Sequence, residues 1–217
     1  PIWAAFAATL IVGTGSSIAG GAGAYFYTYV LGDMKLMSGV SIIGLIASLV
    51  GIVMGPYLAN RFGKKKVYLT AVIISTALNL LRLLDVTSMI LIYISALIGG
   101  VAGGWMVPVS TSIQADNTTY VQYKTGKRAE AAIASLTSFV SKVAQGLGGA
   151  IPGYVIAAYG FVTGASVQPE SINTGIILCA LILPLIFGIL GSLIFGTQYT
   201  LDQKAVIEMD AKINRNN

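Results

Sequence analysis

The sequence is poor in the residues on which most soluble and secreted proteins depend. Only 10% of its 217 residues are charged, and it has one cysteine and no histidine. Soluble domains carry roughly 25% charged residues, so the charge needed to cover a globular surface is missing. A lone cysteine excludes a disulfide within the chain, and without histidine no zinc site of the usual ligand spacing can form. These absences exclude a soluble domain and a disulfide-stapled scaffold.

Long apolar segments take the place of the missing charge, since 55% of the residues are hydrophobic. A bilayer core of about 30 Å needs about 20 apolar residues in a helix, whereas barrel strands are alternating segments of ~10 residues. The apolar runs here are continuous, which predicts an all-α membrane protein. We predict six transmembrane helices in a bundle over residues 1–198 and a tail at 199–217, which forms either a short amphipathic helix or a solvated end. The predicted helices lie at about 2–31, 37–60, 67–84, 89–113, 131–159 and 173–195.

The basic residues are unevenly distributed between the two ends of these segments. Ten of the thirteen follow the second, fourth and sixth segments, and only Lys35 and Arg82 lie on the other side. Because cytoplasmic loops carry an excess of lysine and arginine, we expect a multi-pass protein of the cell (inner) membrane with both termini in the cytoplasm. The chain opens at Pro1 inside an apolar run, and we expect it to be part of a longer protein.

Lys142 lies deep in the fifth segment. Twelve residues separate it from Glu130, which places it about 18 Å into the bilayer. An ammonium group there costs at least a few kcal/mol, so it must face a cavity or an opposite charge, unless it snorkels to the interface. Ser138 and Gln145 share its helical face, which predicts a polar, ligand-facing stripe. A serine nucleophile with a lysine base remains a formal alternative.

Trp105 is predicted near mid-depth of the fourth segment, where an indole could stack on a sugar or simply pack in the core. No Asp or Glu lies deep inside any predicted segment, although sodium or proton coupling usually requires such a carboxylate. Glycine pairs four residues apart, at 99/103, 100/104 and 149/153, predict close helix packing or helices that slide during a transport cycle.

Two predicted loops, one run within the fifth segment and the start of the tail resemble known transporters. The run from Gly55 to Lys66 resembles the loop motif of the major facilitator superfamily. The predicted loop at 115–130, the run at 138–153 and the tail at 199–204 are similar to the glycoside–pentoside–hexuronide:cation symporter family, which includes melibiose and glucuronide carriers. By this resemblance the six segments correspond to helices seven to twelve, the C-terminal half of a 12-helix major facilitator fold.

The resemblance implies secondary active transport of a sugar or glycoside by cation-coupled symport and alternating access, not an enzyme. The implied substrate-binding residues are Trp105, Ser138, Lys142 and Gln145. The implied cytoplasmic gate consists of Arg61, Asp116, Lys124, Lys127 and Arg128.

The resemblance also implies partners. No cofactor, metal or nucleic acid is expected, and the coupling cation (sodium or proton) should bind in the N-terminal six-helix half, which would be the partner of this chain besides the sugar and the bilayer. The alternatives are a non-transporting six-helix membrane subunit or scaffold, and an oligomeric channel.

Overall fold

A computed structural model describes residues 1–127, 129–165 and 167–215. Regular structure in these ranges is helical throughout. The helices are α1 (Ile2–Tyr25), the π-helical turn η1 (Phe26–Val30), α2 (Lys35–Phe62), α3 (Lys64–Arg82), α4 (Met89–Thr125), α5 (Glu130–Ala158), α6 (Ser171–Ile177), the π-helical turn η2 (Leu178–Ile182), α7 (Leu183–Gln198) and α8 (Gln203–Arg215).

Four helical stretches are long and apolar enough to cross a membrane, in agreement with an integral membrane protein. They are Ile2–Val30, Lys35–Phe62, Met89–Thr125 and Ser171–Gln198. Helices α3 and α5 coincide with the other two predicted segments but carry more polar residues, since α3 begins with three lysines and α5 contains Lys142.

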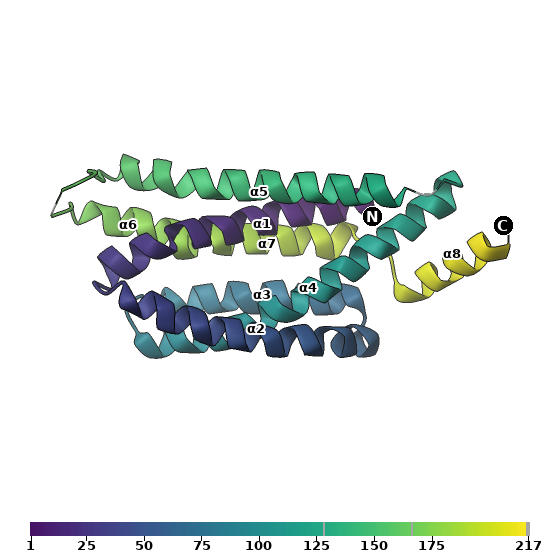
Figure 1. Cartoon of the computed structure of the whole chain (residues 1–217), viewed down its shortest axis with the longest axis horizontal. Helices are drawn as coiled ribbons and strands as arrows, with labels where there is room; N and C mark the ends of the chain where they lie inside the picture. The colour runs from purple at the N-terminus through teal and green to yellow at the C-terminus, as the bar shows by residue number, and fades with distance from the viewer. Residues whose placement is uncertain (128, 166, 216–217) are drawn as a thin grey trace.

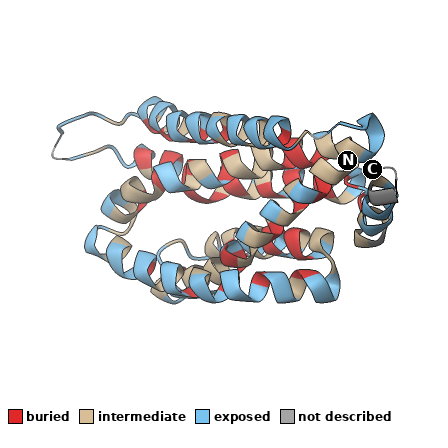
Figure 2. Ribbon diagram, turned by 45° about the vertical axis from the view of Figure 1, so that its right-hand side comes forward, coloured by how far each residue is buried: buried red, intermediate tan, exposed pale blue. Residues whose placement is uncertain are grey.

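The helices form two groups that pack along their length (Figure 1). In one group α1 contacts both α5 and α7, and in the other α4 contacts both α2 and α3. The α3–α7 contact joins the groups, while α4 crosses obliquely toward α5. The N-terminus and α8 lie at the same end of the bundle. Buried residues concentrate between the helices, and the outer faces of α2 and α5 are largely exposed (Figure 2).

Glycines allow α2 and α4 to pack closely. A Cβ added at Gly104 would clash with the carbonyl of Ser48, and one at Gly51 would lie 2.9 Å from the backbone nitrogen of Trp105. The predicted close packing is therefore found at the 100/104 pair. A Cβ at Gly149 or Gly153 would meet no atom within 4 Å, so the described chain places no helix against that pair.

Helix α4 continues well past the predicted end of the fourth segment at residue 113. The stretch 115–125, expected to be loop, is helical because no glycine or proline interrupts it and its polar residues find a place inside the fold. Asp116 and Asn117 are both buried. The helix ends at Gly126, whose φ of 70° suits a residue without a Cβ. An apolar-run criterion stops at the first polar turns and misses this extension.

The tail forms the amphipathic helix α8 rather than a solvated end. Leu201 is buried just before it, and Val206 and Met209 pack against a cluster of buried residues at this end of the bundle. The ammonium of Lys212 lies 5.8 Å from the ring centroid of Tyr123 in α4. Apolar packing and this cation–π contact hold α8 against the extended end of α4.

Candidate functional site

A cavity of about 410 Å³ opens between α1, α4 and α5. Among the described residues, its polar lining consists entirely of uncharged side chains, without Lys, Arg, Asp or Glu. These polar residues are Thr9, Ser16, Ser110, Gln114, Asn117, Thr137 and Ser141. Apolar and aromatic residues complete the wall, with Tyr68 of α3 and Phe195 of α7 among them. Mostly apolar walls with a few polar groups are typical of small-molecule sites.

Asn117 brings a buried, unpaired polar atom to this cavity. The residue is 2% exposed, and its Oδ1 has no hydrogen-bond partner among the described residues. Leaving a buried acceptor unpaired costs about 1–3 kcal/mol, so a donor that a small movement of the Asn117 side chain brought within reach would be favoured. The hydroxyls of Thr9 and Thr137 donate to carbonyls of their own helices, at 2.9 and 2.8 Å, and keep their lone pairs as acceptors. The amide of Gln114 and the hydroxyl of Ser110 also line the cavity and can donate, so the cavity offers both acceptors and donors.

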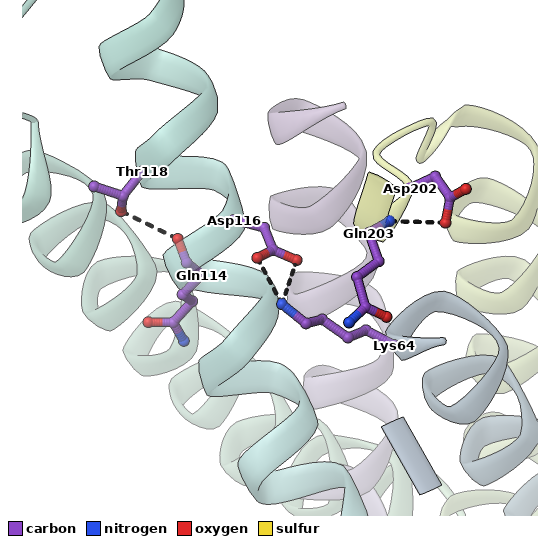
Figure 3. Close-up of polar contacts among 6 residues, drawn as sticks. All are labelled: Lys64, Gln114, Asp116, Thr118, Asp202 and Gln203. Atoms are coloured by element: carbon purple, nitrogen blue, oxygen red, sulfur yellow. Dashed lines mark hydrogen bonds and ion pairs between the residues drawn. The ribbon is translucent and has the colours of Figure 1, made fainter. Parts of the chain in front are cut away.

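An ion pair joins α3 to α4 next to the cavity (Figure 3). The Nζ of Lys64 donates to both carboxylate oxygens of Asp116, at 2.6 and 2.8 Å. The side chains are only 21% and 10% exposed, so solvent screens this pair less than a surface pair. Gly63, with a φ of 87°, makes the sharp turn that brings Lys64 to the start of α3.

Three aromatic rings connect α3 to the end of α7 beside the same cavity. The centroids of Tyr68 and Phe195 lie 4.3 Å apart, and those of Phe195 and Tyr199 lie 4.5 Å apart. The Nζ of Lys65 donates to the carbonyl oxygen of Tyr199 at 2.6 Å. Burial and the negative charge of Asp116 raise the pKa of Tyr199 above its ordinary value.

The four predicted substrate residues lie outside this cavity. Ser138, Lys142 and Gln145 are exposed on α5, where the Nζ of Lys142 donates to Gln145 Oε1 at 3.3 Å. Their neighbours Thr137 and Ser141 line the cavity instead. Trp105 is half-buried, and its indole N–H has no hydrogen-bond acceptor in the described part of the chain.

The predicted gate residues are not all brought together. Asp116 pairs with Lys64, which was not among the predicted site residues. Arg61 is exposed and donates to the Tyr57 hydroxyl at 3.2 Å. Lys124 and Lys127 are exposed at the end of α4, and Arg128 lies outside the described residues.

The polar cavity residues of α4 follow a helical spacing in the sequence, which a search for continuous apolar runs does not detect. Ser110, Gln114 and Asn117 recur at i, i+4 and i+7, which is one face of a helix. Gln114 follows the predicted end of the fourth segment at residue 113, and Asn117 falls in the predicted loop at 115–130, so the prediction does not join the three residues into one polar helical face. Thr137 and Ser141 repeat the same spacing on α5.

Comparison with known proteins identifies relatives over nearly the whole chain. Residues 1–203 match the family model described as MFS/sugar transport protein. A glucuronide carrier protein homolog of Escherichia coli is 30% identical over 90% of this chain and 44% of its own length. An uncharacterized symporter of Bacillus subtilis is 31% identical over 86% of this chain and 41% of its own length. The isoprimeverose transporter of Lactiplantibacillus pentosus is 28% identical over 69% of this chain and 31% of its own length.

The chain thus spans less than half the length of these relatives. Their names describe transporters, not enzymes, in line with the expectation from the sequence. The extent of the family match confirms the resemblance noted from the loop motifs. The chain belongs to the MFS/sugar transport protein family.

Proposed function

We propose that this chain is the C-terminal half of a 12-helix carrier that moves a sugar or glycoside across the inner membrane by alternating access. The relatives are each more than twice as long as the aligned segment, which leaves room for a second six-helix half. Six spans would arise from α1 to α5 and the continuous α6–η2–α7 stretch, with both termini in the cytoplasm.

The neutral polar cavity carries this proposal. Hydroxyl and amide groups from three helices face a space without fixed charge, and such groups suit the hydroxyls of a sugar. The unpaired Oδ1 of Asn117 would accept a hydrogen bond from one of them. A cavity for a metal ion or a charged cofactor would instead present carboxylates or lysines. We therefore propose that the substrate passes or binds between α1, α4 and α5.

The Lys142 stripe, formed by Ser138, Lys142 and Gln145, is separate from the α1–α4–α5 cavity. Ser138, Lys142 and Gln145 lie on an exposed face of α5, and an exposed lysine at this depth needs a polar partner. We propose that this face meets the N-terminal half, which would supply that partner and the site for sodium or a proton. Trp105, with its unpaired indole N–H, would contribute to substrate contact from α4.

The cytoplasmic gate is proposed to include the Lys64–Asp116 pair together with Arg61, Lys124, Lys127 and Arg128. The pair connects α3 and α4 at the end where the basic loops lie. Breaking and remaking such a contact would let α4 move relative to α3 during alternating access.

Two adjacent residues of α4 allow a direct test of the cavity. Ser110 lines it, whereas its exposed neighbour Thr111 does not and instead donates to the carbonyl of Val107. In the complete carrier we expect Ser110→Ala to raise the half-saturating sugar concentration roughly fivefold, because one hydrogen bond is worth about 1 kcal/mol. Uptake of radiolabelled sugar into proteoliposomes measures this effect.

The Thr111→Ala variant is the matched control and should transport with unchanged parameters. Equal losses in both variants would argue for a general effect on α4 rather than on the cavity. Wild-type kinetics in Ser110→Ala would remove the cavity from the substrate path.

A further inference from the structure

A second cavity, of about 210 Å³, lies at the opposite end of the bundle from the Lys64–Asp116 pair. It is enclosed by α2, α3, α4 and the turn η1, away from the α1–α4–α5 cavity. Ser75, Asn79 and Arg82 line it from one face of α3 at i, i+4 and i+7. Ser95 of α4 and Tyr27 of η1 add two further hydroxyl-bearing side chains.

Arg82 has no acidic partner in this cavity. Its Nε is buried and has no hydrogen-bond acceptor among the described residues, and no ion pair to it is formed within the described ranges. The nearest carboxylate in sequence, Asp85, accepts instead from the backbone and hydroxyl of Thr87. Asp33, at the same end, accepts from the backbone nitrogen of Lys35. A half-buried guanidinium without a counter-charge is unfavourable, so something must compensate it.

The contact of Arg82 with Phe26 leaves its donors free. The guanidinium carbon lies 5.0 Å from the ring centroid of Phe26, which provides a cation–π contact. Guanidinium N–H groups radiate in the plane of the group, in the fork geometry that matches carboxylate and phosphate oxygens. Asn79, Ser75 and Ser95 can supply uncharged donors around the same space.

We propose that this cavity is an anion-binding site in which Arg82 holds a phosphate-type oxyanion, either inorganic phosphate or the headgroup of an anionic phospholipid. The lining provides one fixed positive charge, several neutral donors and no carboxylate, which is the composition such an oxyanion requires. The site is separate from the proposed sugar cavity and does not depend on transport. Bound anion would stabilise the contact between α3, α4 and η1.

The test measures thermal stability of the full-length protein in neutral detergent. Sodium phosphate is titrated against sodium chloride at constant ionic strength, and in a second series short-chain phosphatidylglycerol is titrated against phosphatidylcholine. A ligand bound only by the folded state raises Tm with concentration. We expect a saturable rise of roughly 2–4 °C or more with phosphate, with phosphatidylglycerol, or with both. The series that responds identifies the source of the oxyanion.

Two variants assign the effect to Arg82. Arg82→Gln should abolish the rise, whereas Lys35→Gln removes the other, exposed basic residue at this end and should leave it unchanged. Equal rises in the wild type and Arg82→Gln, or no rise in the wild type with either ligand, would overturn the proposal. If Arg82→Gln does not fold, Arg82→Lys replaces it. The proposal then requires at least a severalfold higher half-saturating concentration and fails if that concentration is unchanged.

Discussion

Adjacent residues of α4 serve different surfaces of the molecule. Asp116 turns toward Lys64 on α3, and Asn117 lines the cavity between α1, α4 and α5, because successive residues of a helix point about 100° apart. Both are buried, so each needs a partner, but only Asp116 finds one among the described residues. The ion pair and the unpaired amide therefore lie one residue apart, and a change in either affects the same turn of α4.

Removal of the Asp116 charge should destabilise the protein. In Asp116→Asn the ammonium of Lys64 loses a charge-assisted partner in a poorly exposed place, and we expect a loss of about 1–3 kcal/mol in the free energy of unfolding. Arg61→Gln removes an exposed charge nearby and should change stability by at most about 0.5 kcal/mol. Chemical unfolding in detergent measures both.

The charge-reversed pair Lys64→Asp/Asp116→Lys provides the check on this prediction. If it recovers part of the loss seen in Asp116→Asn, the pairing itself is responsible. A double-mutant cycle with no coupling between positions 64 and 116 would contradict it.

At the scale of elements, close packing is concentrated on particular faces. Helix α2 lies against α4 through glycines of both helices, whereas Gly103, next to Gly104, borders the open cavity. The α1–α5 contact relies on Gly148, where a Cβ would lie 2.9 Å from the carbonyl oxygen of Thr14. Glycine thus allows close helix contact on one face of a helix, and on another face it leaves space for the cavity.

The neighbouring glycines of α4 should respond in opposite ways to a methyl group. Gly104→Ala places a Cβ against the carbonyl of Ser48, and we expect destabilisation of about 1–3 kcal/mol from overpacking. Gly103→Ala meets no atom within 4 Å, so it should be neutral or up to about 1 kcal/mol stabilising through helix propensity. Midpoints of thermal unfolding distinguish the two, and the same sign for both variants would refute the assignment of the packed face.

At the scale of the whole molecule, α2 and α5 are among the helices whose large apolar side chains stay exposed in the described part of the chain. Exposed side chains on α2 include Leu45, Leu49 and Val53, and those on α5 include Phe139 and Tyr154. Lipid can cover apolar residues, but it cannot accept a hydrogen bond from Lys142, which shares the exposed side of α5. The polar stripe is therefore the part of this surface that most needs a protein partner.

We expect the N-terminal half to cover that stripe. In a Cys179→Ala background, Lys142→Cys should react with a water-soluble maleimide several times more slowly in the complete carrier than in the isolated 217-residue chain in the same detergent. Lys127→Cys, at an exposed position beyond the end of α4, should react at similar rates in both. Equal rates for Lys142→Cys would place the stripe outside the contact between the halves. Saturable sugar uptake by the isolated chain would contradict the half-carrier proposal itself.

Hydrophobicity was sufficient to predict helices at all six apolar segments and an integral membrane protein, because the bilayer requires long apolar helices whatever their packing. The loop motifs were sufficient to predict the family, since they are local in sequence. The apolar-run criterion led to one error, because it ends the fourth segment at Ile113, whereas the polar stretch that follows continues helix α4. A helix does not have to end where its residues become polar if other helices supply partners for them.

Only the tertiary structure decided which polar residues meet. The sequence placed Lys142 at mid-depth, but the helix rotation turns Thr137 and Ser141 toward the cavity and Lys142 away from it. Asp116 finds Lys64, 52 residues away, through the α3–α4 contact. The sequence alone does not show which face of α5 lines the cavity, because the buried face of a helix depends on which helices pack beside it. The sequence by itself determined that the protein lies in a membrane and where its apolar helices run. The packing of those helices determined which side chains line the cavities.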